Sequence, residues 1–220
     1  EGAGGENYCT ITYVIESAQE KGLIYTGSDD GLVHITKDGG ATWTNITPEG
    51  VKGSLVNAIE VSPFDKGTVY IAVNKYKFND FTPFIYKSTD YGKTWTKITN
   101  GINPEHFTRV LREDPKQKGL LYAGTETGMY ISFDDGKKWQ AFQLNLPIVP
   151  ITDLAIKGNN LIVATQGRSL WIMDDLTVLH QLYTGNTSEN SLFIPKDSYR
   201  MDGRSRDKSK TSGTNHPNGV

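Results

Sequence analysis

The chain of 220 residues is long enough for a domain with a buried core, and 36% hydrophobic with 22% charged residues is a composition of folded proteins. A formal net charge of −2 gives no electrostatic case for nucleic-acid binding, and no apolar run approaches the roughly 20 residues of a membrane span. A single cysteine excludes an internal disulfide. Abundant glycine (23) and tyrosine (11) favour short strands joined by tight turns.

After a lead-in segment at 1–10, the chain predicts a succession of short strands. The first four are expected at about 11–16, 22–27, 31–37 and 42–47. The second of these, within GLIYTG, is short, β-branched and aromatic, which is typical of a buried strand.

The same succession returns along the chain. The segments GLIYTG, GTVYIA, GLLYAG and NLIVAT align, which makes Tyr25, Tyr70, Tyr122 and Val163 equivalent. The repeat units are expected at about 11–47, 56–99, 107–146 and 151–183. A four-stranded unit that recurs every 40 to 50 residues predicts an all-β protein, a β-propeller of about four consecutive four-stranded antiparallel blades.

Three of the repeats share the pattern [Ser/Thr]-x-Asp-x-Gly-x-x-Trp between their third and fourth strands. The aspartate can accept hydrogen bonds from its own turn, the glycine permits a positive φ, and the tryptophan can bury its ring against the blade. The motif residues are Thr36, Asp38, Gly40, Trp43, Ser88, Asp90, Gly92, Trp95, Ser132, Asp134, Gly136 and Trp139. Because the three aspartates belong to different blades, we interpret them as turn formers and expect no catalytic and no metal-binding residue among them.

The fourth repeat departs from this pattern. It keeps the pair Asp174–Asp175, but Leu176 stands where we expect the glycine, and no tryptophan follows. We therefore expect consecutive blades of a larger propeller, with a closed four-bladed ring as the alternative. An exit strand is expected within 184–201, and 202–220 is expected to be a linker or the start of another domain.

The boxes at blade spacing resemble the Asp-box (BNR) repeats of sialidases, xyloglucan-cleaving glucanases and sortilin-type receptors. The stretches GSDDGLVHITKDGGATWTNITP and ATQGRSLWIMDDLTVLHQL resemble large bacterial Asp-box proteins described as sortilin-like or glycosyl-hydrolase-like. The resemblance covers about 5–200 and implies a secreted protein, extracellular or periplasmic. It specifies the fold more strongly than the function, because enzymes and non-enzymes share the motif.

Strand alternation places the loops between second and third strands on the face opposite the boxes, where a ligand site is expected. The candidates on these loops are Asp29, Asp30, Lys75, Tyr76, Phe78, Glu126 and Arg168. The loop 74–83 is the longest and also carries Phe81; its rings could stack on a sugar or a peptide, or fold back onto the blade. Arg168 could bind an anion, or pair with Asp29, Asp30 or Glu126.

Two functions fit these residues. The first is a non-catalytic propeller segment that binds protein, peptide or carbohydrate, or scaffolds a larger assembly, without a cofactor. The second is part of a xyloglucanase-like or sialidase-like hydrolase whose catalytic pair is completed by further blades. Hydrolysis needs two carboxylates about 5–10 Å apart, and nothing in the sequence pairs the acidic candidates.

Overall fold

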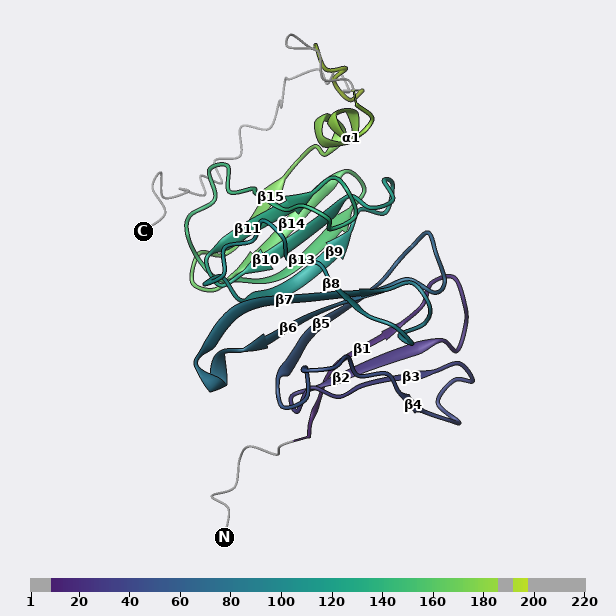
Figure 1. The fold of residues 1–220 in the computed structure, drawn as a ribbon. Coiled ribbons are helices and arrows are strands. Elements are labelled where there is room, and N and C mark those ends of the chain that lie inside the picture. Colours follow the sequence, from purple (N-terminus) through teal and green to yellow (C-terminus); the bar gives the residue numbers. More distant parts are fainter. Residues whose placement is uncertain (1–8, 186–191, 198–220) are drawn as a thin grey trace, which may run out of the picture.

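The computed structural model describes residues 9–185 and 192–197, which fold as four antiparallel sheets that follow one another in the chain (Figure 1). Each of the first three sheets has four strands in sequential order, and the last has three. Each sheet is a meander, so every strand pairs with its neighbours along the chain. This is the arrangement of consecutive propeller blades.

The strand bounds follow the predicted ones to within about two residues in the first blade. The first three blades comprise β1 (Ile11–Glu16), β2 (Ile24–Ser28), β3 (Val33–Thr36) and β4 (Thr44–Asn45); β5 (Leu55–Val61), β6 (Val69–Lys75), β7 (Asp80–Ser88) and β8 (Thr96–Lys97); β9 (Thr108–Glu113), β10 (Leu121–Thr125), β11 (Gly128–Ser132) and β12 (Gln140–Ala141). The last comprises β13 (Ile151–Lys157), β14 (Asn160–Thr165) and β15 (Leu170–Met173), and is followed by helix α1 (Thr177–Tyr183). A short 3-10 helix, η1 (Tyr76–Phe78), lies between β6 and β7.

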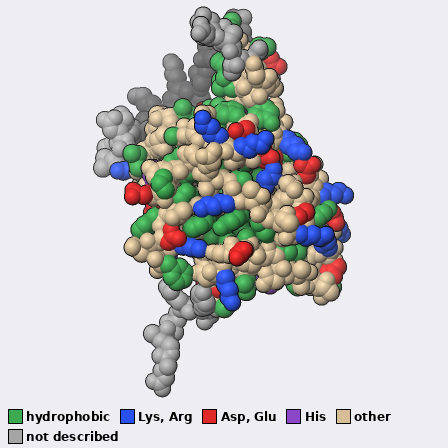
Figure 2. Space-filling model, in the orientation of Figure 1, with side chains coloured by type: hydrophobic (Ala, Val, Ile, Leu, Met, Phe, Trp, Pro, Cys, Tyr) green, Lys and Arg blue, Asp and Glu red, His purple; other side chains and the backbone are tan. Residues whose placement is uncertain are grey.

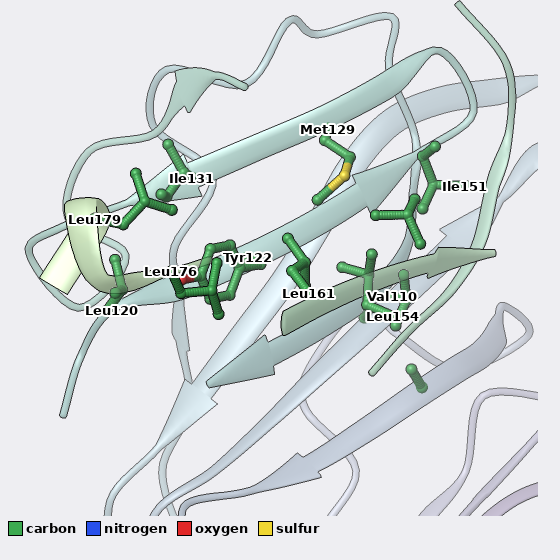
Figure 3. Packing of buried hydrophobic residues seen from close by; sticks show 13 residues of the cluster. Val110, Leu120, Tyr122, Met129, Ile131, Ile151, Leu154, Leu161, Leu176 and Leu179 are labelled. Carbon is green, nitrogen blue, oxygen red and sulfur yellow. The ribbon is translucent and has the colours of Figure 1, made fainter. Parts of the chain in front are cut away.

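Alternation along the strands gives every blade two apolar faces, and each face inside the array packs on a neighbouring blade. Tyr70 points toward the third blade, whereas its neighbour Ile71 points toward the first, because successive side chains of a strand point to opposite faces. Between the third and fourth blades, Tyr122 and Met129 meet Leu161 and Leu154 (Figure 3). The core is therefore a set of layers between blades.

Within residues 9–185 and 192–197 the fourth blade has three strands and no fourth, which corrects the expectation of four strands in every blade. Equivalent backbone bonds run from Asp135 N to Gly119 O in the third blade and from Leu176 N to Asn159 O in the fourth. Asp135 lies in the left-handed region (φ 63°), but Leu176 has φ −87°. A bulky leucine disfavours the left-handed turn, so the chain continues into α1.

The same comparison corrects two alignments. Thr177, not Leu176, is equivalent to the box glycine, because Thr177 follows Leu176 as Gly136 follows Asp135. Ile162, not Val163, is equivalent to Tyr25, because Ile162 pairs with Ile172 as Tyr25 pairs with Ile35. The turn between β13 and β14 is shorter than in the other blades, and a shift of one residue moves a side chain to the other face.

Both ends of the blade array are open, which makes the closed four-bladed ring wrong for this structure. Val14 on the first blade is 60% exposed, although its equivalent Ile59 is fully buried. Leu170 on the last blade is 68% exposed, although its equivalent Met129 is buried. The array is an arc of a propeller with room for further blades on either side (Figure 1).

Residues 192–197 have no regular secondary structure, so the described part of the expected exit strand is not a strand. Ile194 donates from its N–H to Gln181 Oε1 and accepts from Gln181 Nε2, both at 2.9 Å, which holds this segment against α1. The other residues of the expected exit strand beyond Gly185, and all of 202–220, lie outside the described residues. No helix in the described part of the chain is long and apolar enough to cross a membrane.

Candidate functional site

The three Asp boxes form the same hydrogen-bonded turn. In the second box, Ser88 Oγ donates to Asp90 at 2.8 Å, and Asp90 accepts from the backbone N–H of Thr94 at 2.9 Å and from its hydroxyl at 2.7 Å. Gly92 N donates to Ser88 Oγ at 2.8 Å. The hydrogen bonds from Thr94 and Ser88 lower the pKa of Asp90 to about 2. We therefore assign the box carboxylates to turn formation, a role that remains a prediction.

Two of the box tryptophans join neighbouring blades. Trp95 Nε1 donates to Ile46 O, and Trp139 Nε1 donates to Ile98 O, both at 2.7 Å. Trp43, in the first blade, instead donates to Gly40 O of its own turn and remains half exposed. The difference arises because Trp43 has no preceding blade to meet within the described chain.

The long loop of the second blade forms an aromatic ledge at the end of the array opposite the boxes. We define this aromatic ledge as Tyr76, Phe78 and Phe81 with the buried ring of Phe107 from the next blade. Tyr76 stacks on Phe107 at a centroid distance of 5.7 Å, and Phe81 lies at 6.0 Å from it. Phe78 is 64% exposed. The rings thus fold partly onto the blade and still present apolar faces outward.

Charged side chains frame the aromatic ledge. Arg109 lies over the Phe107 ring and donates from Nε to Glu126 Oε2 at 2.6 Å. Lys75 donates to Gly50 O at 2.7 Å, so its ammonium is turned toward the first blade. The structure therefore brings Lys75, Tyr76, Phe78 and Glu126 to one end of adjacent blades, and it adds Phe107 and Arg109, which sequence reasoning missed.

The remaining candidates are not part of the aromatic ledge. Asp29 accepts from Thr10 N at 2.8 Å, and Asp30 accepts from the Ser28 hydroxyl, so both carboxylates are used locally within the first blade, in the turn between β2 and β3. Arg168 is exposed and has no ion pair within the described residues, so the expected pairs with Asp29, Asp30 and Glu126 are not formed. The carbonyl of Arg168 accepts from Trp171 Nε1 at 2.9 Å.

A polar cluster, which the sequence analysis did not predict, lies among the inner strands. Arg112 on β9 donates to Asp153 on β13 at 2.7 Å, to Tyr13 OH on β1 at 3.0 Å and to Leu154 O at 2.9 Å. Glu60 on β5 lies 3.6 Å from the guanidinium, at a hollow of about 360 Å³. Burial raises the pKa of Glu60 to about 7, against the opposing effect of Arg112.

Arg112 donates four hydrogen bonds within the protein, so this cluster fits a polar link between four inner strands. An alignment of the inner strands places Glu60 and Arg112 at the same position as Ile15 and Ala155. The signal in the sequence that could have revealed this cluster is the presence of two charged residues, Glu60 and Arg112, at a strand position that is apolar in the other two blades. Among the described residues, no group of three or more His, Cys, Asp or Glu side chains could hold a metal ion.

Sequential antiparallel blades with Asp-box turns define an incomplete β-propeller of the Asp-box repeat class. The BNR/Asp-box repeat family matches residues 86–97, which contain the second box. By sequence it is similar to the xyloglucanase Xgh74A of Acetivibrio thermocellus, with 29% identity over 57% of this chain and 17% of that protein. It is also similar to vacuolar protein sorting/targeting protein 10 of Laccaria bicolor, with 36% identity over 46% of this chain and 6% of that protein.

Solved structures show the same fold at low identity. The GH74 xyloglucanase from Xanthomonas campestris superimposes with a TM-score of 0.60 at 18% identity, over 76% of this chain and 28% of that one. YCF48 bound to D1 peptide gives a TM-score of 0.57 at 19% identity, over 76% of this chain and 52% of that one. The chain thus spans less than a fifth of the length of the two relatives matched by sequence.

Proposed function

We propose that this chain is a non-catalytic, ligand-binding segment of an Asp-box propeller, and that the aromatic ledge binds the ligand. The observation that carries the proposal is the exposed set of rings held by Phe107 on the face away from the boxes. Flat apolar rings bind the faces of sugars and of apolar peptide side chains. Among the ligands that the sequence leaves open, we favour a carbohydrate, because xyloglucanases are among the relatives.

The carboxylates near this end of the array support binding rather than hydrolysis. A general acid needs a pKa near the working pH, but hydrogen bonds lower the pKa of Asp30 and of Asp80. Glu126 is paired with Arg109, and Asp29 accepts from Thr10. Asp30 and Asp80 are therefore not poised to give a proton to a leaving group.

The second candidate is a segment of a glycoside hydrolase whose active site is shared with further blades. Two observations favour it: the similarity to xyloglucanases, and Glu60, which has a raised pKa and lines a hollow together with Asp153. Under either proposal we infer that the protein acts outside the cytoplasm, which the resemblance to secreted Asp-box proteins supports, and that further blades are its intramolecular partners.

Binding of immobilised xyloglucan oligosaccharides and of a peptide array tests the first proposal. We expect Tyr76→Ala/Phe78→Ala to lose binding by about tenfold or more, since each stacked ring contributes of order 1 kcal/mol. Trp43→Ala is the matched control, because Trp43 is an exposed aromatic residue at the opposite face. Equal binding by both variants would refute the aromatic ledge as the site.

Turnover distinguishes the two candidates. The first proposal, a non-catalytic binding segment, predicts that this chain releases no sugar from a xyloglucan oligosaccharide. Turnover by the unchanged chain that disappears in Glu60→Gln, while the Glu60→Gln protein remains folded, would replace the first proposal by the second.

A further inference from the structure

An apolar hollow of about 230 Å³ lies between the third and fourth blades, beside β15. Its apolar walls come from the segment that follows β12 and from the face of the fourth blade that points toward the third. The residues that carry the argument are Phe142, Leu146, Leu161, Val163 and Trp171.

This hollow is the position that a tryptophan occupies one blade earlier. Trp139, 2% exposed, packs in a cluster with Ile98, Ile102, Leu121, Ala123 and Tyr130. Strand pairing makes Leu161, Val163 and Trp171 the equivalents of Leu121, Ala123 and Tyr130. The bonds from Ile102 N to Thr99 O and from Leu146 N to Gln143 O make Phe142 and Leu146 the equivalents of Ile98 and Ile102. The walls of a tryptophan site are present without the tryptophan.

The hydrogen-bond acceptors of that site are also available. Trp139 donates from its backbone N–H to Asn100 O at 2.8 Å and from Nε1 to Ile98 O. The equivalent acceptors are Leu144 O and Phe142 O, and no hydrogen bond from the described residues reaches either oxygen.

The outer edge of β15 is unpaired as well. In the third blade β12 pairs with β11 at Tyr130 and Ile131, and the equivalent residues Trp171 and Ile172 have no strand beside them among the described residues. The reason is α1, which leads the chain away where the other blades turn back into a fourth strand. An open strand edge is a template for another extended segment.

We propose that this edge binds an extended segment of a partner polypeptide, which adds to β15 as a fourth strand and inserts a tryptophan side chain into the hollow. The chain itself defines this occupant, because the other three blades carry a short fourth strand preceded by a tryptophan. The site is distinct from the aromatic ledge, so the proposed function and this proposal can fail separately.

Fluorescence anisotropy tests the proposal with a labelled, capped peptide of residues 137–143, KKWQAFQ, added to the whole chain. We expect saturable binding, and binding weaker by about tenfold or more for the peptide with Trp139→Ala, since the indole fills the hollow. Ile172→Pro in the chain should abolish binding, because proline removes an outward N–H from the edge. Leu170→Ser is the matched control on the same strand and should bind like the unchanged chain.

Hydrogen exchange keeps the test decisive if Ile172→Pro does not fold. The Ile172 amide should exchange fast in the free chain and slowly with the peptide bound. Equal binding of the tryptophan and alanine peptides, or no change in exchange on adding the peptide, would overturn the proposal. An amide already protected in the free chain would show that a segment of this chain fills the edge, and would overturn the partner strand equally.

Discussion

At the scale of single residues, burial and hydrogen bonding separate two kinds of carboxylate. The box aspartates are exposed but receive several donors, which lowers the pKa of Asp38 and of Asp90. Glu60 is buried between inner strands, where removal from water raises its pKa. The stabilisation of the fold by the box aspartates should therefore be lost as pH falls, whereas that by Glu60 should be lost as pH rises.

Asp90→Ala should lower the thermal midpoint at pH 7, because the turn loses its acceptor for Thr94 and Ser88. The folded pKa of Asp90 is depressed to about 2, so its stabilisation is present above its ordinary pKa and is lost as pH falls through about 2. Thermal melts should thus show a gap between the two proteins that narrows toward pH 2. A gap that is unchanged across this range would contradict the assigned role of the carboxylate.

Glu60→Gln should flatten part of the pH dependence of unfolding between about pH 4.5 and 7. The unfolded chain releases this proton near the ordinary pKa of 4.5 and the folded chain near 7, so the free energy of unfolding falls as pH rises through that window. The contribution is at most about 3 kcal/mol. Chemical denaturation at several pH values measures it.

Glu105→Gln, an exposed change, is the control for Glu60→Gln and should leave the slope intact. Burial also raises the pKa of Glu113, so a smaller slope of the same sign should persist in Glu60→Gln. A slope identical to that of the unchanged protein would show that Glu60 is not the titrating group.

At the scale of elements, the box and the fourth strand act as a connector to the preceding blade. Gly92 approaches Ile46 so closely that an added Cβ would lie 2.4 Å from Ile46 Cδ1, and Gly136 meets Ile98 in the same way at 2.5 Å. The tryptophan that follows each of these glycines then caps the same neighbour. The box is therefore an element of the contact between blades as well as a turn.

Trp139→Ala should cost about 3–5 kcal/mol of unfolding free energy, because it leaves a cavity and an unpaired carbonyl at Ile98. Trp43→Ala removes the same residue type from the same motif, but Trp43 is 44% exposed and should cost about 1 kcal/mol or less. Urea denaturation of both variants gives the comparison. Similar losses would contradict the assignment of the contact to blade packing.

At the scale of the whole molecule, the array ends in two apolar faces that correspond to the two sides of its internal blade contacts. The exposed face of the first blade carries Ile11 and Val14, and that of the last carries Leu170 and Ile172. Charges of both signs are interspersed on the face shown in Figure 2, so no single-sign patch there opposes association.

The isolated chain should associate through these faces, because each is the equivalent of a surface that is buried inside the array. Sedimentation velocity should show species larger than the monomer at micromolar concentration. The double change Val14→Lys/Leu170→Lys should shift the protein to monomer without lowering its thermal midpoint, since both residues are exposed. A monomeric unchanged chain would contradict this expectation.

The sequence by itself determined the repeat, the strand order within a blade and the turn chemistry of the boxes. These depend on local features: alternating apolar residues, the box pattern and the spacing of its copies. Alignment by these local features was wrong by one residue in the fourth blade, where Leu176 and a short turn change the register. Period-two patterns do not reveal such a shift when both faces of a strand are apolar.

Only the tertiary structure decided which side chains meet. Phe107 supports Tyr76, and Arg112 contacts both Tyr13, 99 residues before it, and Asp153, 41 residues after it, because the blades bring their inner strands and loops together. The open hollow beside β15 is likewise invisible in the sequence. It exists because the fourth strand of one blade completes the packing of the blade before it, and here α1 takes the chain elsewhere.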